Sequence, residues 1–224
     1  MLMPECSEIP DSMRTELFRL FWHGSCYNIG AMKYRFSFTA VGLASVATQE
    51  VAALFRESGS WDAVYKRVVR ENTLGCRTES ALKRIGSELV HRLGALSSEE
   101  VDRFVENRLG ERNLFAWLAI CRYYEMIGDL AVEALHEAYV SGQKTFTHTD
   151  YARFVNAKLS LHPELDQVSD QTFAKMRQII FKMMTEAGFL DGEQNIIPVV
   201  MDKDLANFIP ERDFAFFPMF IGGK

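Results

Sequence analysis

The chain of 224 residues is long enough to bury a hydrophobic core, and it fits one domain with an appendage or two small domains. Hydrophobic residues at 48% and charged residues at 25% are typical of a globular protein and exclude a disordered or fibrous chain. The net charge of -5 excludes a protein that is basic over its whole surface, but it leaves room for a local basic surface on an acidic body.

Neither the apolar runs nor the cysteines indicate a membrane or secreted protein. The longest apolar run, Phe115 to Cys121, is far shorter than the roughly 20 residues that a spanning helix needs. The N-terminus has no basic and apolar regions of a signal peptide, so we expect a cytoplasmic protein without a membrane contact. The four cysteines, Cys6, Cys26, Cys76 and Cys121, are widely spaced, and this spacing predicts free thiols. We expect no metal site and no cofactor.

Helical spacing of apolar residues dominates the chain up to residue 142. An N-terminal extension, 1–32, contains one short helix at about 12–22. The aromatic triplet Tyr34, Phe36 and Phe38 is interpreted as an anchor for a helix that begins at Thr39 and runs to about residue 57. Further helices are expected at 61–70, at 78–93 with Thr78 as cap, at 97–109 with a Ser97–Glu100 capping box, at 112–127 and at 130–140. Together they predict a helical bundle over residues 33–142.

A different order of elements follows the segment from Gly142 to His148. Thr147 and Asp150 form a second capping-box pattern before a short helix, and a loop then leads to a long helix at about 170–187. Asp191-Gly192 is a hairpin turn signal. Helix, loop, helix and hairpin predict a winged-helix-like unit over 147–200. The aromatic tail, 201–224, is expected to pack back on the body, with a partner-docking patch as the open alternative.

Patterns of catalytic residues are missing from the sequence. The histidines are scattered singly, at 23, 91, 136, 148 and 162, and no motif places a base next to a nucleophile. These observations predict a protein that is not an enzyme.

Basic side chains concentrate between residues 66 and 92. Seven cations stand there against three glutamates, a local charge of +4. We expect the exposed members to line one surface and contact the phosphates of a nucleic acid: Lys66, Arg67, Arg70, Arg77, Lys83 and Arg84. The alternative is an ordinary solvated face with local ion pairs, such as Arg84 with Glu88.

The long helix at 170–187 carries a second polar stripe. Its apolar positions include Phe173, Met176 and Ile180, and the opposite face presents Gln171, Lys175, Gln178 and Lys182, with Arg177 on the flank. Glutamine and lysine can bond base edges and phosphates in the major groove of DNA. A plain surface helix can carry the same stripe, so both interpretations stay open.

Several sequence runs resemble the BrxA family, helical proteins of bacteriophage exclusion (BREX) defence islands. The resemblance spans roughly residues 33–200 and rests on YRFSFTA at 34–40, SWDAVYKRVVRENTL at 60–74, RTESALKRI at 77–85, FAWLAICRYY at 115–124, HPEL at 162–165 and KMRQIIFKMMTEAGFLD at 175–191. It implies an accessory component of a system with a methyltransferase, a phosphatase-like protein and an ATPase. It also implies a bundle similar to that of the nucleic-acid binder NusB, and DNA binding.

The sequence and this resemblance together predict an all-α protein that binds double-stranded DNA as a non-enzymatic BREX subunit. Phosphate contacts would come mainly from the cations between 66 and 84, with Lys175, Gln178 and Lys182 reaching into a groove. Two alternatives remain. One is a protein-protein scaffold that docks other BREX proteins through the aromatic tail and the helix at 97–109. The other is an RNA-binding protein.

Overall fold

The structure is a computed structural model that describes residues 33–106, 111–201 and 203–221. The N-terminal extension with its expected helix at 12–22, and the last residues of the tail, lie outside the described residues. Residues 33–224 cluster as one compact unit. The division into a bundle at 33–142 and a winged-helix-like unit at 147–200 stays a prediction about subregions within that unit.

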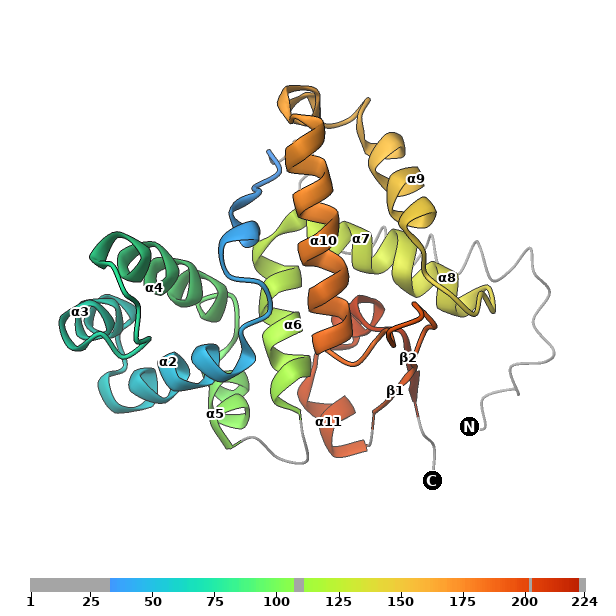
Figure 1. Ribbon diagram of the computed structural model, residues 1–224. Helices are drawn as coiled ribbons and strands as arrows, with labels where there is room; N and C mark the ends of the chain where they lie inside the picture. The colour runs from blue at the N-terminus through green and yellow to red at the C-terminus, as the bar shows by residue number, and fades with distance from the viewer. Residues whose placement is uncertain (1–32, 107–110, 202, 222–224) are drawn as a thin grey trace. The chain divides into compact units, whose positions relative to one another are not determined.

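Helices form most of the described chain, which confirms the all-α class (Figure 1). The α-helices are α2 (Ser45–Ser58), α3 (Trp61–Glu71), α4 (Glu79–Leu93), α5 (Ser98–Glu106), α6 (Arg112–Tyr123), α7 (Glu125–Leu130), α8 (Glu137–Val140), α9 (His148–Lys158), α10 (Asp170–Glu186) and α11 (Lys203–Phe208). Short turns of 3-10 helix are η1 (Ser37–Ala40), η4 (Pro163–Gln167) and η5 (Glu211–Phe216), and a π-helical turn, η3 (Ala131–His136), joins α7 to α8. Strands β1 (Val199–Met201) and β2 (Met219–Ile221) pair in parallel.

Side-chain caps explain where several helices begin, as the sequence predicted. The Thr78 hydroxyl accepts the Ala81 backbone N–H at 3.2 Å before α4. Ser97 and Glu100 exchange the two bonds of a capping box at α5. Thr147 and Asp150 form the second box at α9. Each cap satisfies backbone donors that an open helix end leaves without a partner.

Two expected helices are wrong in their boundaries. Thr39 does not cap a helix, because it lies inside η1 and the chain turns through positive φ at Gly42 and Ala44 before α2 begins. The helix expected at 112–127 breaks at Tyr124, whose φ of -108° and ψ of 103° are not helical. The break turns the chain into α7 in a new direction, and the two helices meet so closely that a Cβ on Gly128 would lie 2.7 Å from the Cys121 carbonyl oxygen. Only glycine fits that contact without a shift of the backbone.

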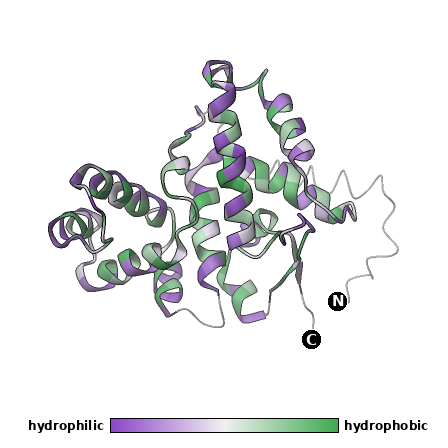
Figure 2. Ribbon diagram, viewed as in Figure 1, coloured by the Kyte–Doolittle hydropathy of each residue, from purple (hydrophilic) through white to green (hydrophobic). Residues whose placement is uncertain are grey.

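Helix α6 lies at the centre of the core, which accounts for its apolar residues on every side (Figure 2). Trp117 is fully buried, and its indole N–H donates to the Phe216 carbonyl at 2.8 Å. Arg122 at the end of α6 pairs with Glu100 of α5 at 2.6 Å and with Asp213 at 2.7 Å. Phe217 of the aromatic tail is buried, while Phe214 and Phe216 are half-buried against the core. These rings therefore contribute to the core and form no exposed aromatic patch.

The segments around α9 and α10 are joined by isolated β-bridges. Leu190 pairs with Ile196 in antiparallel fashion across the turn at Asp191, and Thr145 pairs with Asn195. The Asp191 carboxylate accepts the backbone N–H groups of Glu193 and Asn195 at 2.8 and 2.9 Å, which fixes the turn. The chain thus runs through a bridged segment, α9, η4, α10 and a tight hairpin, in that order.

Candidate nucleic-acid interface

Helices α3 and α4 pack side by side and carry the cations of the first predicted site. Each helix is amphipathic, with Val64 and Val68 of α3 buried against α4. The helices approach closely at Gly86, where a Cβ would stand 3.0 Å from the Val68 side chain. We use the name α3–α4 surface for the six predicted residues, Lys66, Arg67, Arg70, Arg77, Lys83 and Arg84. All are exposed except Arg67, which is half-buried.

Carboxylates neutralise most of the α3–α4 surface. Lys66 pairs with Asp62 at 2.6 Å, and Lys83 pairs with Glu79 at 2.6 Å, each within its own helix. Arg70 lies 2.6 Å from Glu71, which also pairs with Arg67 at 3.1 Å. Arg67 forms a further ion pair with Glu57 of α2. Within the described ranges, Arg77 and Arg84 have no carboxylate within 4.0 Å.

The ion pairs around Glu71 and Glu79 lower the pKa values of these two carboxylates. Hydrogen bonds from Arg70 and Arg67 hold the pKa of Glu71 below its ordinary value, and the hydrogen bond from Lys83 does the same for Glu79. The same hydrogen bond to Glu79 raises the pKa of Lys83. Both glutamates therefore stay ionised at neutral pH, as the local count of +4 already assumes. Asp62 and Glu57 lie outside that count and lower the positive potential over α3 and α4 further.

Arg92, which the count included as a surface cation, is buried with 1% of its area exposed. Its Nη1 donates to the Gly42 carbonyl at 2.6 Å, and its guanidinium lies over the Tyr124 ring. Burial lowers the pKa of Arg92 to about 10. In the described part of the chain, Glu88 lies 3.7 Å from Arg92, and it does not form the ion pair with Arg84 that exemplifies the solvated-face alternative. Both arginines stand four residues from Glu88, and only the packing of α4 against η1 decides between them.

Helix α10 presents the second predicted site. Met176, Ile180 and Met183 are fully buried and fix the rotation of the helix. The opposite side exposes four residues, which we name the α10 face: Gln171, Lys175, Gln178 and Lys182. Lys175 Nζ donates to Gln178 Oε1 at 3.3 Å. The structure thus brings these predicted residues together on one face.

Fewer carboxylates oppose the cations of α10. In the described part of the chain, neither Lys175 nor the half-buried Arg177 has a carboxylate within 4.0 Å, and Lys182 lies 3.7 Å from Glu186. Burial raises the pKa of Tyr151 of α9 to about 12, although the nearby positive charge of Arg177 acts to lower it. The acidic residues Glu186, Asp191 and Glu193 gather at the C-terminal end of α10 and in the turn that follows.

A polar cluster that sequence reasoning missed holds the connection between α9 and α10. Tyr34 stacks on His162 with ring centroids 3.5 Å apart, and its hydroxyl donates to Asp129 at 2.6 Å. Lys158 at the end of α9 pairs with the same Asp129 oxygen at 2.9 Å. Glu164 of η4 accepts the Tyr34 backbone N–H at 2.5 Å. We name these five residues the Tyr34 cluster, and the wide separation of its members along the chain explains why no local pattern revealed it.

Burial and hydrogen bonding shift two groups of this cluster. Burial and the bond to Asp129 raise the pKa of Tyr34. Burial alone would raise the pKa of Glu164, but the backbone hydrogen bond from Tyr34 and the contact with His162 lower it below its ordinary value. The cluster therefore contains an ionised Glu164 and a neutral Tyr34 near pH 7, and it ties η4 to the first described residues and to α7.

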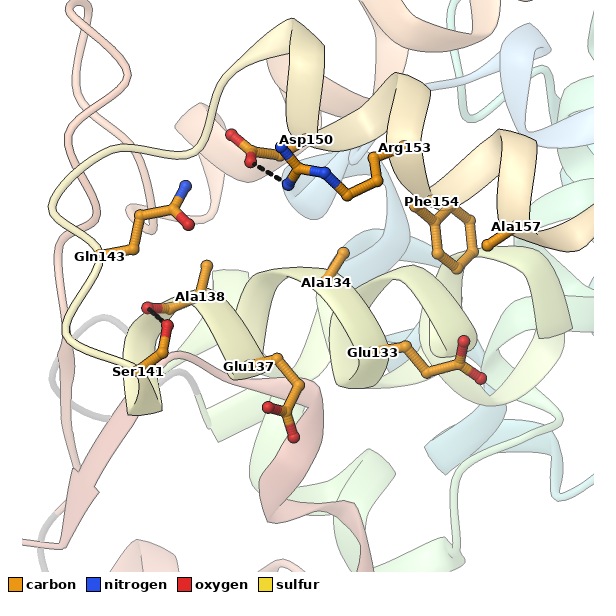
Figure 3. A pocket seen from close by; sticks show the side chains of 10 residues that line it. All are labelled: Glu133, Ala134, Glu137, Ala138, Ser141, Gln143, Asp150, Arg153, Phe154 and Ala157. Carbon is orange, nitrogen blue, oxygen red and sulfur yellow. Dashed lines mark hydrogen bonds and ion pairs between the residues drawn. The ribbon is translucent and has the colours of Figure 1, made fainter. Parts of the chain in front are cut away.

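An open groove of about 330 Å³ lies between η3–α8 and α9 (Figure 3). Ala134 lies opposite Phe154, Ala138 lies opposite Gln143, and the Arg153 guanidinium pairs with Asp150 at 2.9 Å along the upper side of the groove. The Ser141 hydroxyl donates to the Ala138 carbonyl at 3.0 Å. The lining provides no nucleophile paired with a base. In the part of the chain that the structure describes, no group of three potential ligands could hold a metal ion, and no helix is both long and apolar enough to cross a membrane.

The fold and its cationic helix faces define the class: an all-α helical-bundle protein with two exposed polar helix surfaces. The profile of the BrxA family matches residues 32–213, and the chain belongs to this family. Two curated relatives are each named BREX protein BrxA. One, from Escherichia coli O9:H4 (strain HS), is 25% identical over 56% of this chain and 59% of its own length. The other, from Bacillus cereus (strain H3081.97), is 25% identical over 65% of this chain and 73% of its own.

A solved structure shares the fold. The crystal structure of an uncharacterized protein from Magnetospirillum magneticum superimposes with a TM-score of 0.70 at 14% identity and covers 83% of this chain and 96% of that one. At this identity the likeness describes the fold alone. The match to the E. coli relative spans less than two thirds of that protein's length.

Proposed function

We propose that this protein is a non-enzymatic, cytoplasmic DNA-binding subunit of a BREX phage-defence system, in which α10 lies against duplex DNA and the α3–α4 surface makes additional phosphate contacts. Membership of the BrxA family and the names of the curated relatives support the role in phage defence. Other BREX proteins, namely the methyltransferase, the phosphatase-like protein and the ATPase, are the proposed protein partners.

The observation that carries the proposal is the order of elements around α10. A bridged segment at Thr145, then α9, η4, α10 and the hairpin at Asp191 follow the order of a winged helix-turn-helix, in which the second helix lies in the major groove. The same rotation that buries Met176 and Ile180 exposes Lys175 and Lys182. A helix placed in this way offers donors to phosphates and to base edges.

The non-enzymatic part of the proposal is supported by the structural contacts of the histidines. His162 stacks on Tyr34, and His136 lies 2.7 Å from the Phe217 carbonyl through Nδ1. His148 contacts the Phe181 ring edge to face. His91 stacks on Tyr123. Each described histidine thus has a packing role that accounts for its position.

Fluorescence anisotropy with a 20-base-pair duplex over a series of salt concentrations tests the proposal. Binding releases counterions, so affinity should fall steeply as salt rises. We expect Lys175→Glu with Lys182→Glu to weaken binding by at least about tenfold and to reduce the salt slope by about 2, since each lost phosphate contact contributes about 0.9. Reversal of Lys66, Arg67 and Arg70 should weaken binding less, because those side chains are already paired with carboxylates.

Lys203→Glu is the matched control, because Lys203 is an exposed lysine on α11, outside both surfaces. It should leave the affinity within about twofold. Absence of duplex binding at 50 mM salt, or equal losses in the Lys203 and Lys175 variants, would overturn the assignment. Competition with duplex RNA of the same length separates DNA binding from RNA binding. If the protein prefers RNA, the added duplex RNA displaces the bound DNA.

Deletion of the aromatic tail would not test the scaffold alternative cleanly. Phe217 is buried in the core and the Phe216 carbonyl accepts the Trp117 indole N–H, so removal of residues 214–224 would destabilise the fold and remove any binding indirectly. Substitution of exposed residues of α5, such as Glu99→Lys, probes protein docking without touching the core. Loss of partner capture with DNA affinity unchanged would favour the scaffold role.

A further inference from the structure

The two halves of α10 differ in the charges around them. The first half carries Asp170, Lys175 and Arg177, a net positive charge of one, and neither cation is paired in the described residues. In the second half Lys182 lies near Glu186, and Asp191 and Glu193 follow in the fixed turn. Carboxylates stand at both ends of α10, since Glu164 and Asp166 of η4 precede it. The cations without a carboxylate partner lie in the first half, so a duplex approaches that half more closely.

The first half presents a surface suited to base edges. Gln171 and Gln178 are exposed and stand seven residues apart, two helical turns or about 10.5 Å along the axis. That distance matches about three base-pair steps of 3.4 Å. Ala174 is also exposed and stands between the two glutamines on the same side. Three side chains of the same face can therefore contact the edges of neighbouring base pairs.

The chemistry of this surface matches one base pair in particular. A glutamine amide donates to adenine N7 and accepts from the adenine N6 amino group, and a small apolar side chain packs on the thymine methyl group. Lys175 Nζ donates to the Gln178 carbonyl oxygen at 3.3 Å, which orients the amide and leaves its NH2 group free to donate. The carbonyl oxygen keeps a second lone pair for the N6 amino group.

We propose that α10 reads adenine–thymine pairs in the major groove of duplex DNA, with Gln178 and Gln171 on adenine and Ala174 against the thymine methyl group. This inference rests on the proposed function and adds the identity of the bases and the residues that distinguish them. Lys175 has two roles in this proposal: it orients the Gln178 amide, and it places a positive charge near the phosphate backbone of the DNA. Lys182, beside Glu186, contributes to affinity and not to base choice.

Base analogues that remove single groups from the major groove test this inference with the full chain. One 20-base-pair duplex contains alternating adenine and thymine. A second replaces every adenine with 7-deazaadenine, which lacks the N7 acceptor, and a third replaces thymine with uracil, which lacks the methyl group. All three carry the same backbone charge. We expect the wild-type protein to prefer the first duplex over the 7-deaza duplex by at least about fivefold, and over the uracil duplex by a smaller factor.

Gln178→Ala should reduce the preference over the 7-deaza duplex, and Gln171→Ala with Gln178→Ala should abolish it, while the affinity of both variants for that duplex stays within about twofold of the wild type. Gln167→Ala is the matched control, because Gln167 is an exposed glutamine of η4 outside the α10 face. It should keep the full preference. Equal, salt-dependent binding of all three duplexes by the wild-type protein would overturn the base assignment and leave the proposed function standing. Failure to bind any duplex would overturn both.

Discussion

On the α3–α4 surface, four of six cations have a carboxylate within 4.0 Å, whereas on α10 neither Lys175 nor Arg177 has one in the described part of the chain. A charge count along the sequence ranks the first region higher, since seven cations fall within it. The structure removes this lead, because Glu57 and Asp62 lie just outside the counted window and pair with Arg67 and Lys66. Among the described residues two unpaired cations then remain in each region: Arg77 and Arg84 on the α3–α4 surface, and Lys175 and Arg177 on α10. The unpaired side chains, and not the total charge, mark the surface that is available to a polyanion.

The largest effect is expected from a substitution on the buried side of α10. Ile180 is fully buried and fixes which residues the helix exposes. Ile180→Ala should lower the free energy of unfolding by about 2–4 kcal/mol, through lost burial and the cavity left behind. Chemical denaturation measures the change. Lys182→Ala on the exposed side should cost less than about 0.5 kcal/mol, and similar losses in the two variants would contradict the rotation of α10.

The Tyr34 cluster offers a smaller perturbation that is confined to the α10 side. Tyr34→Phe removes the hydroxyl that donates to Asp129 and should cost about 1–2 kcal/mol, because the acceptor is charged and the bond is shielded from water. Hydrogen exchange should accelerate in η4. Thr78→Ala removes the cap of α4 and should cost about 1 kcal/mol without changing exchange in η4. Unchanged exchange in η4 in the Tyr34 variant would show that the cluster does not hold the connection.

Removal of the carboxylates that pair with the α3–α4 surface should make this surface bind DNA more like the α10 face does. With Glu57→Gln, Asp62→Asn and Glu71→Gln, the α3–α4 surface keeps its cations and loses their partners. We expect duplex DNA affinity at 100 mM salt to rise by about three- to tenfold and the salt slope to steepen. Glu137→Gln on α8 is the control for an unrelated exposed carboxylate. An affinity that does not rise in the triple variant would exclude the α3–α4 surface from the binding site.

The smallest expected effect concerns the acid titration of the paired carboxylates. Because the folded pKa values of Glu71 and Glu79 lie below their ordinary value of 4.5, the pairs stabilise the fold fully above that pH and are lost as pH falls through the lower folded values. NMR titration of the side-chain carboxyl carbons should give midpoints below 4.5 for both. Lys83→Gln should return Glu79 to about 4.5 and leave Glu71 unchanged. A Glu79 midpoint that is insensitive to Lys83 would show that this pair does not form in solution.

Local signals were enough to predict the helices that begin with caps. Thr78, the Ser97–Glu100 box and the Thr147–Asp150 box act within four residues, so the sequence displays them directly. The break at Tyr124 could not be predicted in this way. It depends on the approach of Gly128 to the Cys121 carbonyl, and an apolar helix without internal caps gives no local sign of such a change of direction.

The site was predictable in its residue types and not in its electrostatics. Helical spacing correctly placed Lys175 and Gln178 on one exposed face. Whether a cation is solvated, paired or buried depends on neighbours that are distant in sequence, as the Arg67–Glu57 pair and the buried Arg92 show. The α10 face therefore followed from periodicity, whereas the partial neutralisation of the α3–α4 surface required three-dimensional contacts.

The hydrogen bond from Trp117 to the Phe216 carbonyl also constrains the order in which the protein can fold during synthesis. The two residues are 99 positions apart, and a ribosome that adds about 5–20 residues per second needs about 5–20 s to make the intervening chain. During that interval the central helix has neither this acceptor nor Asp213 to receive Arg122. The nascent chain thus holds the Trp117 indole next to an unfilled part of the core, a stage at which chaperone binding would protect it from aggregation.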